Sequence, residues 1–142
     1  MKRLRNQTGA ALLETAITIP LVLLVTVSIF EFGRAYQTWQ ILTNAAREGA
    51  RVAILADATD ERIRNTVTAY LTNGKLAKPN SATITINRAK PFGTTNTASE
   101  VTVAYPFNFR VLNPVIRLVQ AGSKTGQGTT TITSVALMRN ES

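Results

Sequence analysis

Few side chains in this sequence could do chemistry. The 142 residues include no cysteine and no histidine, which excludes cysteine and serine-histidine nucleophiles, disulfides and zinc sites built on these residues. Eight carboxylates remain as candidate acid-base groups, against 16 lysines and arginines. We therefore expect no enzymatic activity, no cofactor and no metal site.

Seven of the eight acids have ordinary structural explanations as helix caps, first-turn residues, ion pairs or chain ends. They are Glu31, Glu48, Asp57, Asp60, Glu61, Glu100 and Glu141. The pair Asp57 and Asp60 precedes a predicted helix, where acidic side chains cap free backbone amides. A hydrolase that uses two carboxylates is therefore not favoured.

The eighth acid, Glu14, lies in an apolar segment. Residues 10–30 carry no other charge, and as a helix they extend about 31 Å, close to the thickness of a bilayer hydrocarbon core. This pattern predicts a transmembrane helix. Pro20 lies inside it, where the loss of one backbone hydrogen bond is tolerated more readily than in a soluble helix.

The positive charge before this segment predicts its orientation. Residues 1–9 contain Lys2, Arg3 and Arg5 and no acid, so we expect the N-terminus in the cytoplasm and everything after the helix outside it. The basic residues further along are scattered among several elements. The net charge of +8 therefore indicates membrane orientation rather than nucleic-acid binding.

A carboxylate within a membrane helix needs a partner, because insertion costs about 2.5 to 3.5 kcal/mol at the bilayer centre. If the chain were cut after Gly9, Glu14 would be the fifth residue of the product, one helical turn, or about 6 Å, from the new amine. That amine, or the amine of a neighbouring helix, could neutralise Glu14. Pairing between helices would also fix their axial register. The alternative is that Glu14 reaches the cytoplasmic headgroups.

Helical character continues beyond the membrane, because residues 36–56 contain no proline and place small or apolar side chains on one face. The stripe comprises Leu42, Ala45, Ala46, Gly49, Val52, Ala53 and Ala56. On the neighbouring surface, Arg47, Glu48 and Arg51 have the spacing of helical ion pairs. They are either a solvated face or, together with Gly49, a docking surface for another protein.

The rest of the chain predicts one more helix and then a sheet. Residues 61–73 form an amphipathic pattern, with capping residues at 57–60 and Gly74 as a stop. Strands are predicted at 82–88, 100–109 and 129–138. In the second, alternation predicts one buried face made of Val101, Val103, Tyr105, Phe107 and Phe109, and Pro106 places this strand at an edge or gives it a bulge near its end. A short helical turn is predicted at 112–120 and a loop at 122–128.

These elements give an α+β fold. A long N-terminal transmembrane helix continues as a spine packed on a small antiparallel sheet of three or four strands, with one short additional helix. We expect a leader at 1–9, a transmembrane helix at 10–30, its extracytoplasmic continuation at 31–56 and an extracytoplasmic α+β domain at 57–142.

The stretch from Gln7 to Glu14 resembles a type IV prepilin cleavage site, in which a peptidase cuts between the residues that correspond to Gly9 and Ala10. Two further elements, Glu31-Phe32-Gly33-Arg34 and Asn44-Ala45-Ala46-Arg47-Glu48-Gly49-Ala50-Arg51, are similar to the N-terminal region of TadE-like proteins. Those proteins are minor pilins, or pseudopilins, of the tight-adherence (Flp) type IV pilus system. The specific part of this resemblance covers residues 8–53.

The resemblance implies a non-enzymatic pilus component, processed by the prepilin peptidase and held in the inner membrane before it joins the pilus. Its implied partners are the major pilin, another minor pilin and the inner-membrane assembly platform. Cleavage would remove three basic residues and no acid, and would leave a net charge of +5.

Two rival interpretations remain open. One is a membrane-tethered extracytoplasmic binding module that is never cleaved. The other is a secretory signal peptide, with Gly33 and Ala35 before a cut at Tyr36. The apolar run is long for a signal peptide, and Arg34 lies inside that site.

Overall fold

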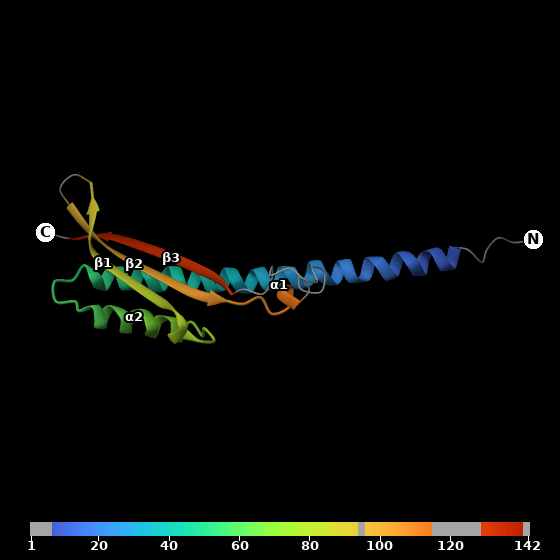
Figure 1. Cartoon of the computed structure of the whole chain (residues 1–142), viewed down its shortest axis with the longest axis horizontal. Coiled ribbons are helices and arrows are strands. Elements are labelled where there is room, and N and C mark those ends of the chain that lie inside the picture. The colour runs from blue at the N-terminus through green and yellow to red at the C-terminus, as the bar shows by residue number, and fades with distance from the viewer. Residues whose placement is uncertain (1–6, 94–95, 115–128, 141–142) are drawn as a thin grey trace, which may run out of the picture. The chain divides into compact units, whose positions relative to one another are not determined.

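The computed structural model describes residues 7–93, 96–114 and 129–140. The architecture is α+β, as predicted, with a long N-terminal helix, a short second helix and a three-stranded antiparallel sheet (Figure 1). The elements in chain order are α1 (Gln7–Ala53), α2 (Asp60–Asn73), the 3-10 turn η1 (Pro79–Ser81), β1 (Thr83–Phe92), β2 (Asn96–Phe107) and β3 (Thr130–Arg139).

The chain divides into two compact units, and α1 contributes to both. The first unit combines α1 up to Arg34 with the chain that follows from Phe109. The second contains the rest of α1, from Ala35, with α2 and the three strands. The core of small and aliphatic side chains lies in this second unit.

The C-terminal part of α1 buries most of the predicted stripe in this core. Leu42, Ala45 and Ala46 are fully buried. Ala50 is also fully buried, although it was not one of the predicted stripe residues. The predicted end at residue 56 was wrong, because α1 ends at Ala53 and Ala56 is exposed.

The side chain of Arg88 holds the turn that follows α1. Arg88 extends from β1 and donates hydrogen bonds to the backbone oxygens of Leu55 (3.2 Å) and Ala58 (2.6 Å). The Leu55 oxygen also accepts a hydrogen bond from the Ala58 amide at 3.2 Å. The carbonyls of this turn are therefore satisfied by a strand residue and by the turn itself. The sequence before residue 57 carries no local sign of this distant donor.

Helix α2 ends at Asn73 as predicted, but it begins at Asp60, one residue earlier than predicted, and neither Asp57 nor Asp60 is its N-cap. Thr59, within the predicted capping segment, accepts a hydrogen bond from the Arg62 amide at 3.2 Å. Asp57 instead pairs with the side chain of Arg62 at 3.0 Å. Gly74 is the C-cap, but its φ of −71° is ordinary, and Lys75 adopts the left-handed conformation with φ of 58°.

The sheet has the order β1-β2-β3, and both pairings are antiparallel. Val101, Val103, Tyr105 and Phe107 are buried on one face of β2, as predicted from their alternation. The register between β1 and β2 shifts between Asn87 and Lys90, which marks an irregularity in the outer strand.

The expectation that Pro106 places β2 at an edge was wrong, because β2 is the central strand. The missing backbone N–H of Pro106 is tolerated because β1 does not extend beside β2 at this position. Thr83 at the start of β1 pairs with Ala104, so beyond Ala104 β3 is the one strand of the described residues that pairs with β2, and Pro106 pairs there with Thr131. At Pro106 the central strand is therefore locally an edge.

Phe109 was predicted to continue the buried face of β2, but the strand ends at Phe107. Of the turn predicted at 112–120, the structure describes residues 112–114 as helical, and residues 115–120 lie outside the described part. The predicted loop at 122–128 also lies outside it.

Candidate functional site

The N-terminal part of α1 is an exposed apolar helix with one ionisable residue, Glu14, between residues 9 and 30. Its most apolar 18-residue window has a mean hydropathy of 2.2, and none of this window is buried against the rest of the protein. Among the described residues, this is the one helix long and apolar enough to cross a membrane. Pro20 lies within it.

Three hydroxyl groups on this part of α1 are satisfied by the helix itself. Thr15, Thr26 and Ser28 each donate to the carbonyl oxygen four residues earlier, over 2.7 to 2.8 Å. Such internal bonds let polar side chains reside in a medium without water. These three side chains are therefore compatible with a lipid environment.

Gly9 and Ala10, the expected cleavage position, lie in the first turn of α1 and are exposed. A side chain built at Gly9 would meet nothing within 4 Å. Glu14 lies one turn further on and is also exposed. The leader residues Lys2, Arg3 and Arg5 lie outside the described residues.

A buried carboxylate lies near the end of the apolar segment. Glu31 is 6% exposed, and its Oε2 accepts hydrogen bonds from the backbone amide of Arg110 at 2.7 Å and from the Arg34 guanidinium at 3.2 Å. Beside it, the rings of Phe32 and Phe109 meet edge to face, with centroids 6.0 Å apart. These contacts attach the chain after β2 to α1.

From the sequence, Glu31 is one of seven acids with an ordinary structural explanation, and its burial was not predicted. Its partner amide belongs to a residue 79 positions away. No local pattern specifies such a contact, because any backbone amide can serve as the donor. The one sequence feature that could have indicated the burial of Glu31 was its position as an isolated acid at the edge of an apolar run.

The expected docking residues on α1 separate onto two faces. Glu48 and Arg51 form a bidentate ion pair, with contacts of 2.5 and 3.0 Å, and Arg47 is exposed near them. Arg51 donates hydrogen bonds to the Glu48 carboxylate and so lowers its pKa. Gly49 is buried on the other side, between Val67 of α2 and Val101 of β2.

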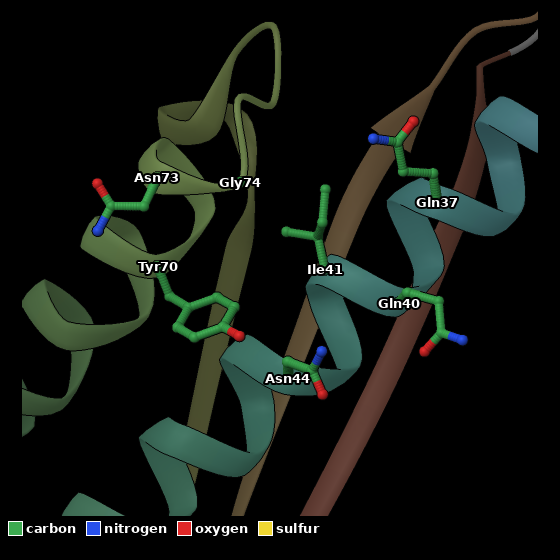
Figure 2. Close-up of a pocket in the computed structure, with 7 residues that line it drawn as sticks. All are labelled: Gln37, Gln40, Ile41, Asn44, Tyr70, Asn73 and Gly74. Atoms are coloured by element: carbon green, nitrogen blue, oxygen red, sulfur yellow. The ribbon is translucent and has the colours of Figure 1, made fainter.

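A shallow hollow of about 420 Å³ lies between α1 and α2, and Figure 2 shows the residues that line it. Ile41 and Asn44 of α1 face Tyr70 of α2 across it (Figure 2). Gln40 turns away from α2 and donates to the Tyr36 hydroxyl at 2.7 Å. Amide and aliphatic groups line this hollow together with one phenol, and none of its lining residues is a carboxylate or a cation.

No cluster of three or more acids that could hold a metal ion occurs among residues 7–93, 96–114 and 129–140. The N-terminal part of α1 is thus a surface suited to contact lipid or other helices, with one acid near its start.

Comparison with protein families gives one match, to TadE-like proteins, over residues 9–51. This segment is TadE-like. The match begins at the expected cleavage glycine, ends two residues before the end of α1 and includes Glu14, Glu31, Arg47 and Arg51. No curated protein and no solved structure matches the chain.

The TadE-like match includes the apolar part of α1, which is long and apolar enough to cross a membrane. The matched residues contain both the exposed apolar helix and the helical stripe that the sheet and α2 cover. The sheet itself lies outside the match.

Proposed function

We propose that the protein is a minor pilin of a tight-adherence pilus, anchored in the inner membrane by α1 and cleaved after Gly9 by the prepilin peptidase. The observation that carries the proposal is the TadE-like match from residue 9 to residue 51, together with an apolar helix that has Glu14 as its early acid. The α+β domain then lies outside the cytoplasm.

Glu14 has a specific task in this proposal. Cleavage creates an amine on Ala10, one helical turn from the carboxylate. In an assembly of packed helices, the Glu14 carboxylate pairs with its own amine or with the amine of a neighbouring subunit. A subunit out of register would leave the acid unpaired in an apolar medium, which disfavours that position.

The exposed side chains of Arg47 and Arg51, with Glu48, form the proposed docking surface for the major pilin or a second minor pilin. Gly49, buried between α2 and the sheet, serves packing within the subunit. The proposed partners also include the inner-membrane assembly platform.

The test of processing is the N-terminus of the protein isolated from membranes with and without the prepilin peptidase. We expect a chain that starts at Ala10 when the peptidase is present and an uncut chain when it is absent. Gly9→Leu should block the cut, whereas Gly33→Leu, at another open glycine of α1, should leave it unchanged.

An intact N-terminus in peptidase-containing membranes would instead support the uncleaved binding module. A chain that begins at Tyr36 would support a signal peptide. Either result contradicts the minor-pilin proposal as stated.

The role of Glu14 is tested separately from cleavage. Glu14→Gln keeps the size of the side chain and removes its charge, so we expect normal processing but loss of incorporation into pili. Glu61→Gln, an exposed first-turn acid of α2, is the matched control. Equal incorporation of both variants would contradict the pairing role.

A further inference from the structure

We propose that the chain after β2, from Phe109 to Val111, lies in the phospholipid headgroup layer on the side of the membrane that carries the α+β domain, where Arg110 binds a lipid phosphate. This contact with the membrane is a second one, in addition to α1. It rests on the membrane anchor of the proposed function and uses residues that lie outside the TadE-like match.

The length of the apolar segment places the next turn of α1 at the membrane boundary. Residues 10–30 extend about 31 Å, which fills a hydrocarbon core, and each headgroup layer adds about 5 to 7 Å. Glu31 and Arg34 lie one and four residues beyond this segment, or about 1.5 and 6 Å along the helix. Both residues are therefore at the depth of the headgroups.

Two contacts attach the chain after β2 to α1 at this depth. The Arg110 amide donates to the Glu31 carboxylate at 2.7 Å, and the rings of Phe32 and Phe109 meet edge to face. Residues up to Arg34 and residues from Phe109 also belong to the same compact unit. The depth of Phe109 and Arg110 in the membrane therefore follows from the depth of Glu31.

The charged groups at this point leave one cation in excess. The Glu31 carboxylate is buried and accepts a hydrogen bond from the Arg34 guanidinium at 3.2 Å. The side chain of Arg110 is exposed, and among the described residues no carboxylate forms an ion pair with it. A guanidinium binds phosphate through two parallel hydrogen bonds. The phosphate of a phospholipid is the anion that a membrane offers at this depth.

The surroundings of Arg110 suit the headgroup layer and not the hydrocarbon core. Val111 is 43% exposed and Phe32 is 61% exposed, and such a mixture of basic and apolar side chains is typical of segments that lie in the membrane interface. The backbone from Phe109 to Val111 is neither helix nor strand. Hydrocarbon excludes exposed backbone of this kind, whereas the hydrated headgroup layer can satisfy its polar groups.

The depth of this segment can be measured with a single spin label, because the chain contains no cysteine. The full chain with Val111→Cys is labelled with a nitroxide and reconstituted in vesicles of phosphatidylcholine and phosphatidylglycerol. Paramagnetic resonance then compares collisions of the label with oxygen, which concentrates in lipid, and with a water-soluble nickel chelate. Leu21→Cys in the apolar segment is the hydrocarbon reference, and Thr85→Cys at an exposed position of β1 is the water reference. We expect an intermediate depth at Val111, with nickel access several-fold lower than at Thr85.

The phosphate contact is tested by adding Arg110→Gln to the Val111→Cys chain, a change that keeps the backbone amide bound by Glu31. We expect nickel access to the label to rise several-fold in vesicles. Arg110→Lys should keep most of the protection, and Arg139→Gln, at an exposed arginine of β3, should leave it unchanged. In dodecyl maltoside micelles, which contain no phosphate, Arg110→Gln should have no effect. An equal rise in vesicles and micelles would show that Arg110 serves the local fold, and would overturn the phosphate contact.

Three results overturn the position in the headgroup layer. The first is nickel access at Val111 equal to that at Thr85, and the second is oxygen access equal to that at Leu21. The third is protection by a second copy of the chain, seen as spin-spin broadening that disappears on dilution with unlabelled protein while nickel access rises. Resistance to alkaline carbonate extraction reports the anchor separately. A chain that stays in the membrane with Val111 in water contradicts this contact and leaves the proposed function intact.

Discussion

Gly49 of α1 lies so close to Val67 of α2 that a Cβ on the glycine would stand 2.6 Å from the valine Cγ2. The same Cβ would be 3.2 Å from Cγ1 of Val101 in the central strand. A glycine in a helix interior costs about 1 kcal/mol relative to alanine. Here it allows α1 to approach α2 and the sheet at one point.

We expect Gly49→Ala to destabilise the second unit. Val67 is β-branched and fully buried, so it has little freedom to move away, and overpacking of this kind costs about 1 to 3 kcal/mol. The gain in helix propensity offsets about 1 kcal/mol of this cost. Thermal unfolding of the full chain in detergent, followed by circular dichroism, measures the net loss.

Gly33→Ala is the matched control, because a Cβ at Gly33 meets nothing within 4 Å. Its unfolding temperature should equal or exceed that of the unmodified protein. If Gly49→Ala were as stable as Gly33→Ala, the close approach of α1 and α2 at this position would be contradicted.

A second close approach joins Gly74 to Ile41, whose Cγ2 would be 2.6 Å from a Cβ at the glycine. Because the φ of Gly74 is −71°, alanine meets no backbone penalty there, and any loss of stability comes from the clash. We expect Gly74→Ala to cost about 1 to 3 kcal/mol alone and much less in the background Ile41→Ala. Additive losses in the double-mutant cycle would refute the contact.

The contact between Glu31 and the Arg110 amide predicts a change in protease sensitivity. Glu31→Ala removes the acceptor for this amide and for Arg34, and an unsatisfied buried donor costs about 1 to 3 kcal/mol. We therefore expect trypsin to cut after Arg110 faster in Glu31→Ala than in the unmodified chain. Mass spectrometry of the early fragments identifies the cut.

Glu48→Ala is the control for this experiment, because it also removes an acid three residues before an arginine, but at an exposed ion pair. It should leave the rate of cutting after Arg110 unchanged. Similar acceleration in both variants would show that Glu31 does not hold the segment.

The Glu48 and Arg51 pair predicts a small dependence of stability on pH. Arg51 lowers the pKa of Glu48 from its ordinary 4.5, so the pair stabilises the folded state above that value and loses this contribution as acid protonates the carboxylate. Exposed helical pairs of this kind contribute little to stability, because solvent screens them. Glu48→Gln should lose this small contribution at neutral pH, and the difference should vanish in acid below the lowered pKa. A difference independent of pH would contradict the ion pair.

Local patterns were sufficient to predict the elements of the fold. The alternation of Val101, Val103 and Tyr105 gave the buried face of β2, and the capping segment and Gly74 bounded α2. These features depend on neighbours in sequence. The order of the strands depends on pairings between distant segments. Pro106 alone could therefore not show that β2 lies at the centre of the sheet.

The candidate site residues also form two groups, one that local sequence reveals and one that depends on distant contacts. Glu14 stands out because a charge in an apolar run is conspicuous in any sequence. The contacts that hold Glu31 and the turn after α1 come from Arg110 and Arg88, which lie 79 and 30 to 33 residues away from the groups they bind. Contacts of this kind require knowledge of the tertiary fold.

The burial of the α1 stripe has a consequence for the order of events during synthesis. The residues that cover it arrive late, since Ser134 of β3 reaches Thr43 across 91 positions and Ser99 of β2 reaches Ala53 across 46. The ribosome therefore releases the apolar helix, and with it the alanines of α1, well before the strands that cover them exist. Helix insertion precedes closure of the domain, and the small side chains of Ala45, Ala46 and Ala50 limit how much apolar surface the nascent chain exposes during that interval.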